Sequence, residues 1–219
     1  LAADRCWAPF GGRESVLTQA ASTYRRVWDA QLAPYDGIRE ALVRLAALGW
    51  QIVVYSESDA ATTAARLTRM GLAGLIPRVF GRAPFSQPLR REWTLVQSPA
   101  RVPITIDQVP RHDMKPNPAG LRAIITRCGG SLAHTVYVGD NLARDVVMAR
   151  RLGVRPLWAK YGTERRPEHV MLLDRVAHWT AADVAEERTV TSERTSPDSI
   201  LEHGAALFDA VAAVPVPIG

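Results

Sequence analysis

The chain has 219 residues, of which 47% are hydrophobic and 22% are charged, and its formal net charge at pH 7 is +5. This composition is typical of a globular protein with a sizeable core, and no apolar run approaches the roughly 18 residues that cross a membrane. The first residues carry charges where a signal peptide needs an apolar stretch. The two cysteines, Cys6 and Cys128, are too far apart for a disulfide framework or a zinc site. These features predict a cytoplasmic protein without a membrane partner.

Arginine supplies most of the positive charge. Of the 27 positively charged side chains, only Lys115 and Lys160 are lysines, and the charges are spread along the chain. A spread charge is more typical of a solvated surface than of a nucleic-acid interface, so we expect no nucleic-acid partner. Binding of nucleic acid through the arginines stays open as an alternative and would show a steep dependence on salt.

The first part of the chain alternates between helical and strand periodicity. The predicted elements are a helix over 14–32, a helix over 38–48, a strand over 50–55, a helix over 60–70 and a short strand over 78–80. Gly49 and Gly71 are suitable helix stops, and SESD after the first strand reads as a loop.

Residues 82–114 interrupt this alternation with scattered prolines and arginines, among which 104–106 could form a strand. An excursion of this length is compatible with a lid over an anionic substrate and equally with a solvated loop. Periodicity then returns. The predicted elements are a helix over 119–128, a strand over 135–138, a helix over 141–152, a strand over 154–159 and a last helix over 200–211.

Strands that alternate with helices predict an α/β fold, namely a Rossmann-like parallel sheet with helices on both faces. Ligands of such sheets bind beyond the carboxyl ends of the strands. Ser56 follows one predicted strand and Asp140 follows another, so we expect both at one edge of the sheet.

Four side chains at this edge suit a phosphoryl group and a hard divalent cation. They are the hydroxyl of Ser56, the ammonium of Lys115 and the carboxylates of Asp140 and Asp145. Carboxylates are preferred ligands of Mg²⁺, and an ammonium and a hydroxyl can hold phosphate oxygens. Taken singly, each residue has an ordinary alternative, such as a helix cap for Ser56 or a solvated surface position for Lys115.

The order of these motifs resembles the haloacid dehalogenase superfamily, most of whose members are Mg²⁺-dependent phosphatases. IVVYSES resembles the second motif of that family, KPNP carries the lysine of the third, and VGDNLARD resembles the fourth. The resemblance implies that Ser56 binds phosphate, that Lys115 stabilises the nucleophile and the transferring phosphoryl group, and that Mg²⁺ is the cofactor. It implies that Asp140 is a metal ligand and that Asp145 is a second ligand or the partner of the lysine. Glu57, beside Ser56, is expected to line the substrate site.

The first motif of the family, a strand followed by DxDx(T/V), does not stand upstream of Ser56. In the family its first aspartate is the nucleophile and its second is the general acid/base. Asp4, Asp29 and Asp36 do not follow a strand, and Asp107 comes too late in the chain and lacks a second aspartate two residues on.

Loss of that strand, which is central in the family's sheet, would leave two neighbouring strands without a partner. The chain also begins with leucine rather than methionine. We therefore expect a processed or truncated chain whose first motif lies upstream. In this interpretation 1–33 is the end of a helical cap, 34–180 is the core, and 181–219 is a polar stretch with a C-terminal helix.

The sequence hypothesis is thus a Mg²⁺-dependent phosphatase that hydrolyses a small phosphorylated metabolite through an aspartyl-phosphate. The chain as given would be inactive because it lacks the nucleophile. The alternative is a catalytically inactive domain of the same fold that binds a ligand or a partner protein. Dehalogenase chemistry would not need the metal site that Asp140 and Asp145 suggest.

Overall fold

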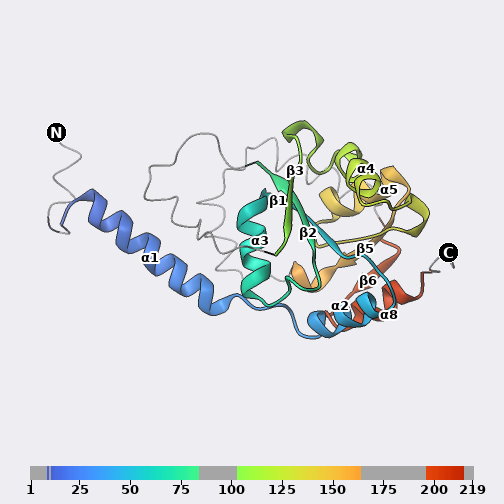
Figure 1. Ribbon diagram of the computed structural model, residues 1–219, viewed down its shortest axis with the longest axis horizontal. Helices are drawn as coiled ribbons and strands as arrows, with labels where there is room; N and C mark the ends of the chain where they lie inside the picture. The colour runs from blue at the N-terminus through green and yellow to red at the C-terminus, as the bar shows by residue number, and fades with distance from the viewer. Residues whose placement is uncertain (1–8, 10, 84–102, 164–195, 215–219) are drawn as a thin grey trace.

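The computed structural model describes residue 9 and residues 11–83, 103–163 and 196–214 (Figure 1). Helices and strands alternate along these ranges. The main elements are α1 (Arg13–Gln31), α2 (Ile38–Ala47), β1 (Val53–Asp59), α3 (Ala60–Arg69), β2 (Arg78–Arg82), β3 (Thr105–Gln108), α4 (Pro118–Arg127), β4 (Val136–Gly139), α5 (Val147–Leu152), β5 (Arg155–Ala159), β6 (Ser199–Leu201) and α8 (Ala206–Ala212). A π-helical turn, Leu142–Val146, precedes α5, and 3-10 turns cover Arg111–Asp113, Leu132–His134 and Lys160–Gly162.

The strands of the described residues form two three-stranded sheets. Their orders are β1-β2-β3 and β4-β5-β6, and every pairing is parallel. This confirms the α/β class, in which parallel neighbours are joined by crossover helices. Within the described residues, β1 and β4 are edge strands with one partner each. The division between the two sheets therefore falls between β1, which carries Ser56, and β4, which Asp140 follows.

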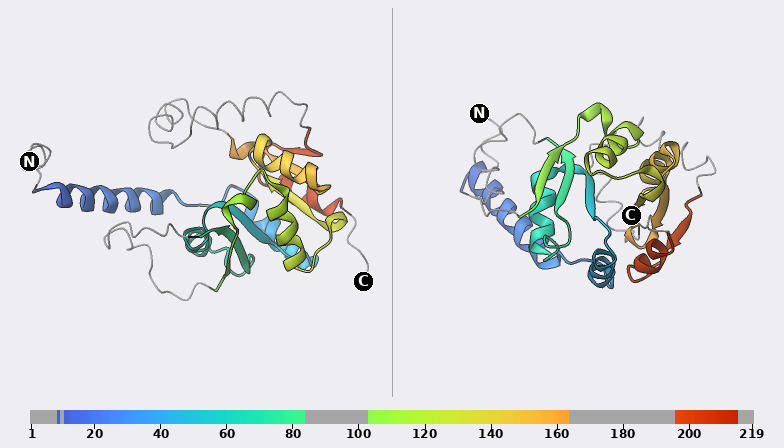
Figure 2. Two further views of the ribbon diagram at one scale, coloured as in Figure 1. Left: turned by 90° about the horizontal axis from the view of Figure 1, so that it is seen from above. Right: turned by 45° about the vertical axis from the view of Figure 1, so that its right-hand side comes forward.

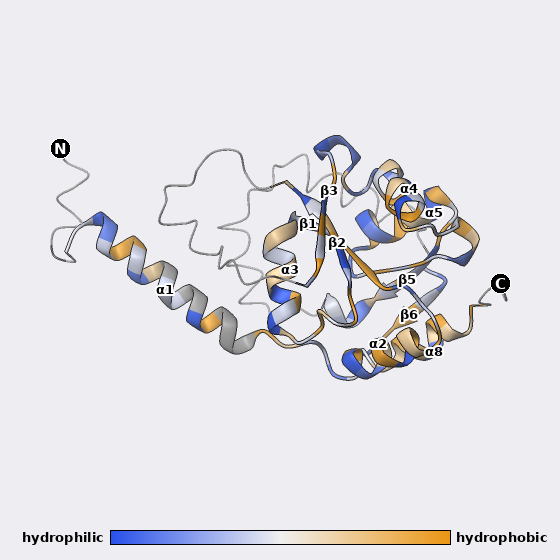
Figure 3. Cartoon of the chain, in the orientation of Figure 1, coloured by the Kyte–Doolittle hydropathy of each residue, from blue (hydrophilic) through white to orange (hydrophobic). Residues whose placement is uncertain are grey.

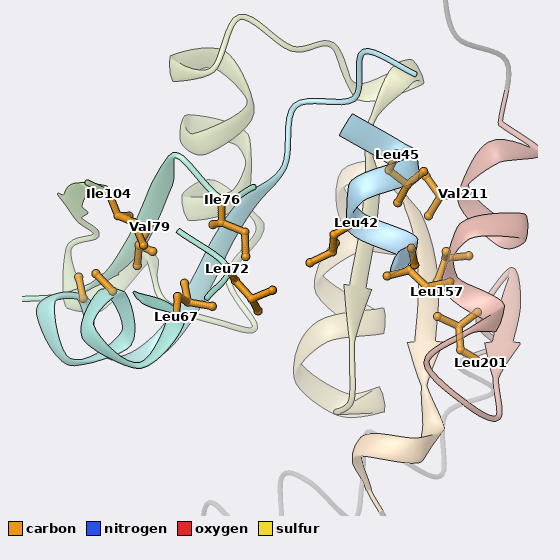
Figure 4. Packing of buried hydrophobic residues seen from close by; sticks show 14 residues of the cluster. Leu42, Leu45, Leu67, Leu72, Ile76, Val79, Ile104, Leu157, Leu201 and Val211 are labelled. Carbon is orange, nitrogen blue, oxygen red and sulfur yellow. The ribbon is translucent and has the colours of Figure 1, made fainter. Parts of the chain in front are cut away.

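A shared hydrophobic core holds the two sheets together. Its largest cluster contains Leu42 of α2, Val79 of β2, Leu157 of β5 and Leu201 of β6, with further residues of α3 and α8 (Figure 4). Residues of both sheets thus belong to one cluster although no strand pairing joins β1 to β4 among the described residues. Burial of apolar surface, which needs no particular direction, takes the place of the missing hydrogen bonds.

The opposite face of the sheets is covered by α4 and α5. Phe80 packs there against Ile124, and Tyr137 packs with Met148, while Tyr55 contacts both groups. Val79 and Phe80 are neighbours in β2 but belong to different clusters, as strand alternation requires. The prediction of helices on both faces is therefore confirmed.

Local signals account for several helix ends. Gly49 and Gly153 follow α2 and α5 with φ of +86° and +79°, a left-handed conformation that favours glycine. The side chain of Asp59 accepts the N–H of Thr62 at 2.8 Å and caps α3. Asn117 caps α4 in the same way. These ends were predictable because each depends on residues close together in the sequence.

The predicted helix over 200–211 is wrong at its start. Residues Ser199–Leu201 form strand β6, which pairs with β5, and α8 begins only at Ala206. A three-residue strand is too short to show its own alternation, so the free edge of β5 decides its conformation. The prediction of a loop at SESD is also wrong, because β1 begins at Val53 and continues through Ser56 to Asp59, while β3 begins at Thr105. Residues 84–102 and 164–195 of the predicted excursion and C-terminal stretch lie outside the described residues.

Helix α1 projects from the rest of the described chain (Figure 2). It confirms the predicted helix over 14–32 to within one residue at each end, while its assignment to a cap stays a prediction. Its surface carries both hydrophilic and hydrophobic residues (Figure 3). No helix among the described residues is long and apolar enough to cross a membrane.

The neighbours Leu201 and Ile200 in β6 provide a test of this packing. Leu201 is 1% exposed and belongs to the shared core, whereas Ile200 is 50% exposed. We expect Leu201→Ala to lower the free energy of unfolding in urea by about 2–5 kcal/mol through the cavity it leaves. Ile200→Ala should change it by less than about 1 kcal/mol. Equal losses would contradict the register of β6.

Candidate functional site

The predicted site residues lie at the carboxyl ends of β1 and β4. Ser56 and Glu57 belong to the second half of β1, and Asp140 directly follows β4. Asp145 lies in the π-helical turn after β4, and Lys115 lies in the loop before α4. Since β1 and β4 are each an edge strand of a different sheet, the site spans the division between the sheets.

A buried ion pair is the centre of the site. The Nζ atom of Lys115 lies 2.8 Å from Oδ1 of Asp145, and the two side chains are only 11% and 4% exposed. The hydroxyl of Tyr137 donates to Oδ1 of Asp145 at 3.0 Å, and the backbone N–H of Asn141 donates to Oδ2 at 3.1 Å. Three donors therefore compensate this carboxylate for the loss of water.

The close approach of Asp145 to β4 depends on a glycine. A Cβ atom on Gly139 would collide with the Cβ and carboxyl atoms of Asp145. The glycine of the sequence motif therefore makes room for the aspartate six positions later, so that the turn can fold back onto the end of its own strand.

Two tyrosines flank the ammonium of Lys115. Its Nζ lies 5.1 Å from the ring centroid of Tyr55 in β1 and 5.5 Å from that of Tyr137 in β4. Such positions favour a cation through the charge distribution of the rings. The hydroxyl of Tyr55 also donates to the carbonyl of Asp113 at 3.1 Å, which ties the loop that carries Lys115 to β1. Lys115 thus contacts side chains of β1 and of β4, which belong to different sheets.

Burial extends the pH range over which these tyrosines stay protonated. Burial and the negative charge of Glu57 raise the pKa of Tyr55, and burial with the neighbouring Asp145 raises the pKa of Tyr137 well above its ordinary value. A phenol that keeps its proton remains a hydrogen-bond donor, so Tyr137 continues to stabilise the charged form of Asp145.

Asp140 has a different environment from Asp145. Asp140 is exposed, and its backbone carbonyl accepts the indole N–H of Trp158 at 2.9 Å. A Cβ atom added to Gly162 would lie 2.9 Å from the Cβ of Asp140. The loop after β5 therefore packs closely against Asp140 and leaves its carboxylate near solvent.

Ser56 and Glu57 lie on the other side of the division, in β1. The Oγ atom of Ser56 accepts the backbone N–H of Ser58 at 3.1 Å. The carboxylate of Glu57 forms an ion pair with Arg144 in the turn after β4, with Oε1 and Nη1 2.8 Å apart. Lys115–Asp145 and Glu57–Arg144 are thus two ion pairs that join separate segments of the chain at this edge.

Sequence reasoning missed Tyr55, Tyr137 and Arg144. Tyr55 directly precedes Ser56, and Tyr137 lies three positions before Asp140 in the neighbouring motif. The positions of the two tyrosines in strands beside the motifs were a usable signal. The alternation of side chains along a strand does not say, however, which face of the strand contacts Lys115.

The described side chains do not assemble a metal site by themselves. No group of three or more His, Cys, Asp or Glu residues that could hold a metal ion occurs in the described ranges. Both oxygens of Asp145 already accept bonds from protein donors. Of the two predicted ligands, Asp140 is the one whose exposure suits Mg²⁺, which usually keeps several waters and takes one or two carboxylates.

The only two lysines of the chain allow a matched test of the buried pair. Lys115→Ala leaves Asp145 buried with one donor fewer, so we expect a loss on the order of 3 kcal/mol in the free energy of unfolding. Lys160 forms an exposed ion pair with Glu202, with Nζ and Oε2 2.9 Å apart, and Lys160→Ala should cost less than about 1 kcal/mol. Similar losses in urea unfolding would contradict the central place of Lys115.

A second test uses the loss of folding stability at high pH. The pKa values of Tyr55, Tyr137 and Tyr161 are all raised in the folded protein, chiefly by burial. Their contribution to stability is complete below the unfolded pKa of about 10 and declines as the pH rises above it. We expect tyrosinate absorbance from these residues to appear together with loss of the folded circular dichroism signal. Full tyrosinate absorbance at about pH 10 with the fold intact would contradict this.

A comparison with models of protein families gives a match that covers most of the described helices and strands. The model of the haloacid dehalogenase-like hydrolase family matches residues 10–153, a range that contains Ser56, Lys115, Asp140 and Asp145. A search of curated proteins finds no significant match. The parallel α/β architecture agrees with the family match, and the chain belongs to the haloacid dehalogenase-like hydrolases.

Proposed function

We propose that the protein is a phosphatase that hydrolyses the phosphoric monoester of a small metabolite. The observation that carries this proposal is the ammonium of Lys115, which Asp145 holds between a tyrosine ring of β1 and a tyrosine ring of β4. A fixed, largely desolvated cation at that edge suits the charge of a transferring phosphoryl group, because its position needs no reorganisation during the reaction.

Ser56 and Lys115 are proposed to hold the phosphoryl oxygens. The hydroxyl of Ser56 lies on β1, one residue after the tyrosine whose ring contacts Lys115. Its Oγ accepts a backbone N–H, which leaves its own proton available for donation to an oxygen of the substrate. Asp145 is proposed to act as the partner of the lysine, the second of the two roles that the family resemblance offers.

The nucleophile is proposed to be an aspartate on a further parallel strand between β1 and β4. Both strands have an unpaired edge within the described residues. All seven residues of β1 are only partly buried, whereas β2 has three fully buried residues. The carboxyl end of a strand placed there would lie between Ser56 and Asp140. We propose that this strand precedes residue 1 of the present sequence.

The chemistry on such an aspartate divides hydrolysis into two steps. The carboxylate oxygen forms a bond to phosphorus as the ester oxygen leaves with the electron pair of the broken bond and takes up a proton. Water then cleaves the acyl phosphate and releases inorganic phosphate. Mg²⁺ is the cofactor that we propose, with Asp140 as one ligand and with the remaining ligands from outside the described side chains.

Helix α1 is proposed to be part of a cap over the same edge. The connection from α1 to α2 lies at that edge, since the ring of Tyr35 is 5.0 Å from that of Tyr161, which follows β5. A cap attached at this position can close over a substrate and exclude water.

Asp140 provides the test of catalysis. In the complete protein we expect Asp140→Asn to lower Mg²⁺-dependent phosphate release from an aryl phosphate by at least about a hundredfold, since a lost metal ligand removes several kcal/mol of charge stabilisation. Asp209→Asn on α8, an exposed position, has the same charge change and should leave the rate unaltered.

Near-normal turnover in Asp140→Asn would contradict the ligand assignment. Binding of inorganic phosphate without turnover in the complete wild-type protein would favour the alternative of a non-catalytic binding domain.

A further inference from the structure

A second ion pair spans the division between the sheets at the candidate site. Glu57 lies in β1 directly after Ser56, and Arg144 lies in the turn after β4 directly before Asp145. The pair joins positions 87 residues apart in the sequence. Glu57 is therefore the neighbour of a residue proposed to bind phosphate, and Arg144 is the neighbour of the carboxylate that holds Lys115.

This pair differs from Lys115–Asp145 in its exposure to solvent. The side chains of Arg144 and Glu57 are 31% and 37% exposed, although Nη1 and Oε1 are only 2.8 Å apart. Ion pairs that solvent reaches contribute little to stability, so an incoming anion can displace Glu57 at little cost. Lys115 cannot exchange its partner in this way because Asp145 is buried beneath it.

The main chain of Arg144 is held in place while its side chain reaches solvent. Its backbone N–H is accepted by Oδ1 of Asn141 at 2.9 Å, which fixes the start of the turn. The guanidinium is thus attached to a fixed segment of main chain at the rim of the site. Glu57 is close enough to the centre of the site to raise, together with burial, the pKa of Tyr55.

We infer that Arg144 recognises a second anionic group of the substrate and exchanges Glu57 for it. The inference rests on the proposed phosphatase function and narrows its substrate class to phosphorylated compounds that carry another carboxylate or phosphate. A guanidinium presents parallel N–H donors that match either group, and Glu57 acts as a competing carboxylate that disfavours substrates without one.

A purely structural clamp between the two sheets makes a different prediction. Removing either member of a clamp has the same sign of effect, because both variants lose the same bond. In the exchange proposed here the signs differ: loss of Arg144 weakens binding of a two-anion ligand, and loss of Glu57 strengthens it.

The test is calorimetric binding to the complete protein with two non-hydrolysable probes. 3-Phosphonopropionate carries a phosphonate and a carboxylate, and propylphosphonate carries the phosphonate alone. We expect Arg144→Gln to weaken the first probe by about tenfold and to leave the second nearly unchanged. Glu57→Gln should strengthen the first probe by about twofold to fivefold, and Arg144→Lys should lie between Arg144→Gln and the wild type.

Arg150 and Asp198 are the matched control. They form an ion pair of 2.7 Å near the amino ends of β5 and β6, with an arginine that is somewhat more exposed than Arg144. Arg150→Gln and Asp198→Asn should leave both affinities unchanged, and thermal unfolding verifies that all variants are folded.

The outcomes separate the inference from the proposed function. Equal effects of Arg144→Gln on both probes, or weaker binding of 3-phosphonopropionate in Glu57→Gln, would overturn the role of Arg144 while leaving the phosphoryl site intact. Failure of the wild-type protein to bind either probe would overturn the phosphoryl site and the inference with it.

Discussion

The buried ion pair between Lys115 and Asp145 is the interaction on which the site depends. A carboxylate at this depth is stable only if its charge is compensated, and Lys115, Tyr137 and the backbone of Asn141 supply that compensation. The same contacts place the loop before α4 against the turn after β4. Through the ring of Tyr55 they also reach the other sheet. One electrostatic requirement therefore positions groups from three separate parts of the chain.

The division between the sheets follows from how the two kinds of stabilisation work. Apolar burial is non-directional, so the core around Leu157 and Leu201 can join two sheets that share no ladder. Backbone hydrogen bonds are directional and leave the edges of β1 and β4 unpaired within the described residues. The positions where pairing is incomplete are also those where the motif residues gather. This coincidence links the proposed nucleophile strand to the architecture as well as to the family resemblance.

Two cations with different constraints lie at the site. Lys115 is enclosed by protein groups and, in the proposed phosphatase, suits the constant task of stabilising the phosphoryl group. Arg144 is paired with Glu57 near solvent and suits a variable task, such as distinguishing one substrate from another. Separation of these tasks allows the specificity of such a site to change without disturbing its buried centre.

The sequence by itself determined what depends on neighbouring residues. The alternation of helices and strands, the helix ends at Gly49 and Gly153, and the order of the motifs around Ser56, Lys115 and Asp140 were all readable from it, and with them the family. Tertiary structure alone decided that β6 forms beside β5, that Tyr55 and Tyr137 flank Lys115, and that Glu57 meets Arg144. Periodicity and turn residues report short-range constraints, whereas these contacts depend on strand register and packing between segments distant in the chain.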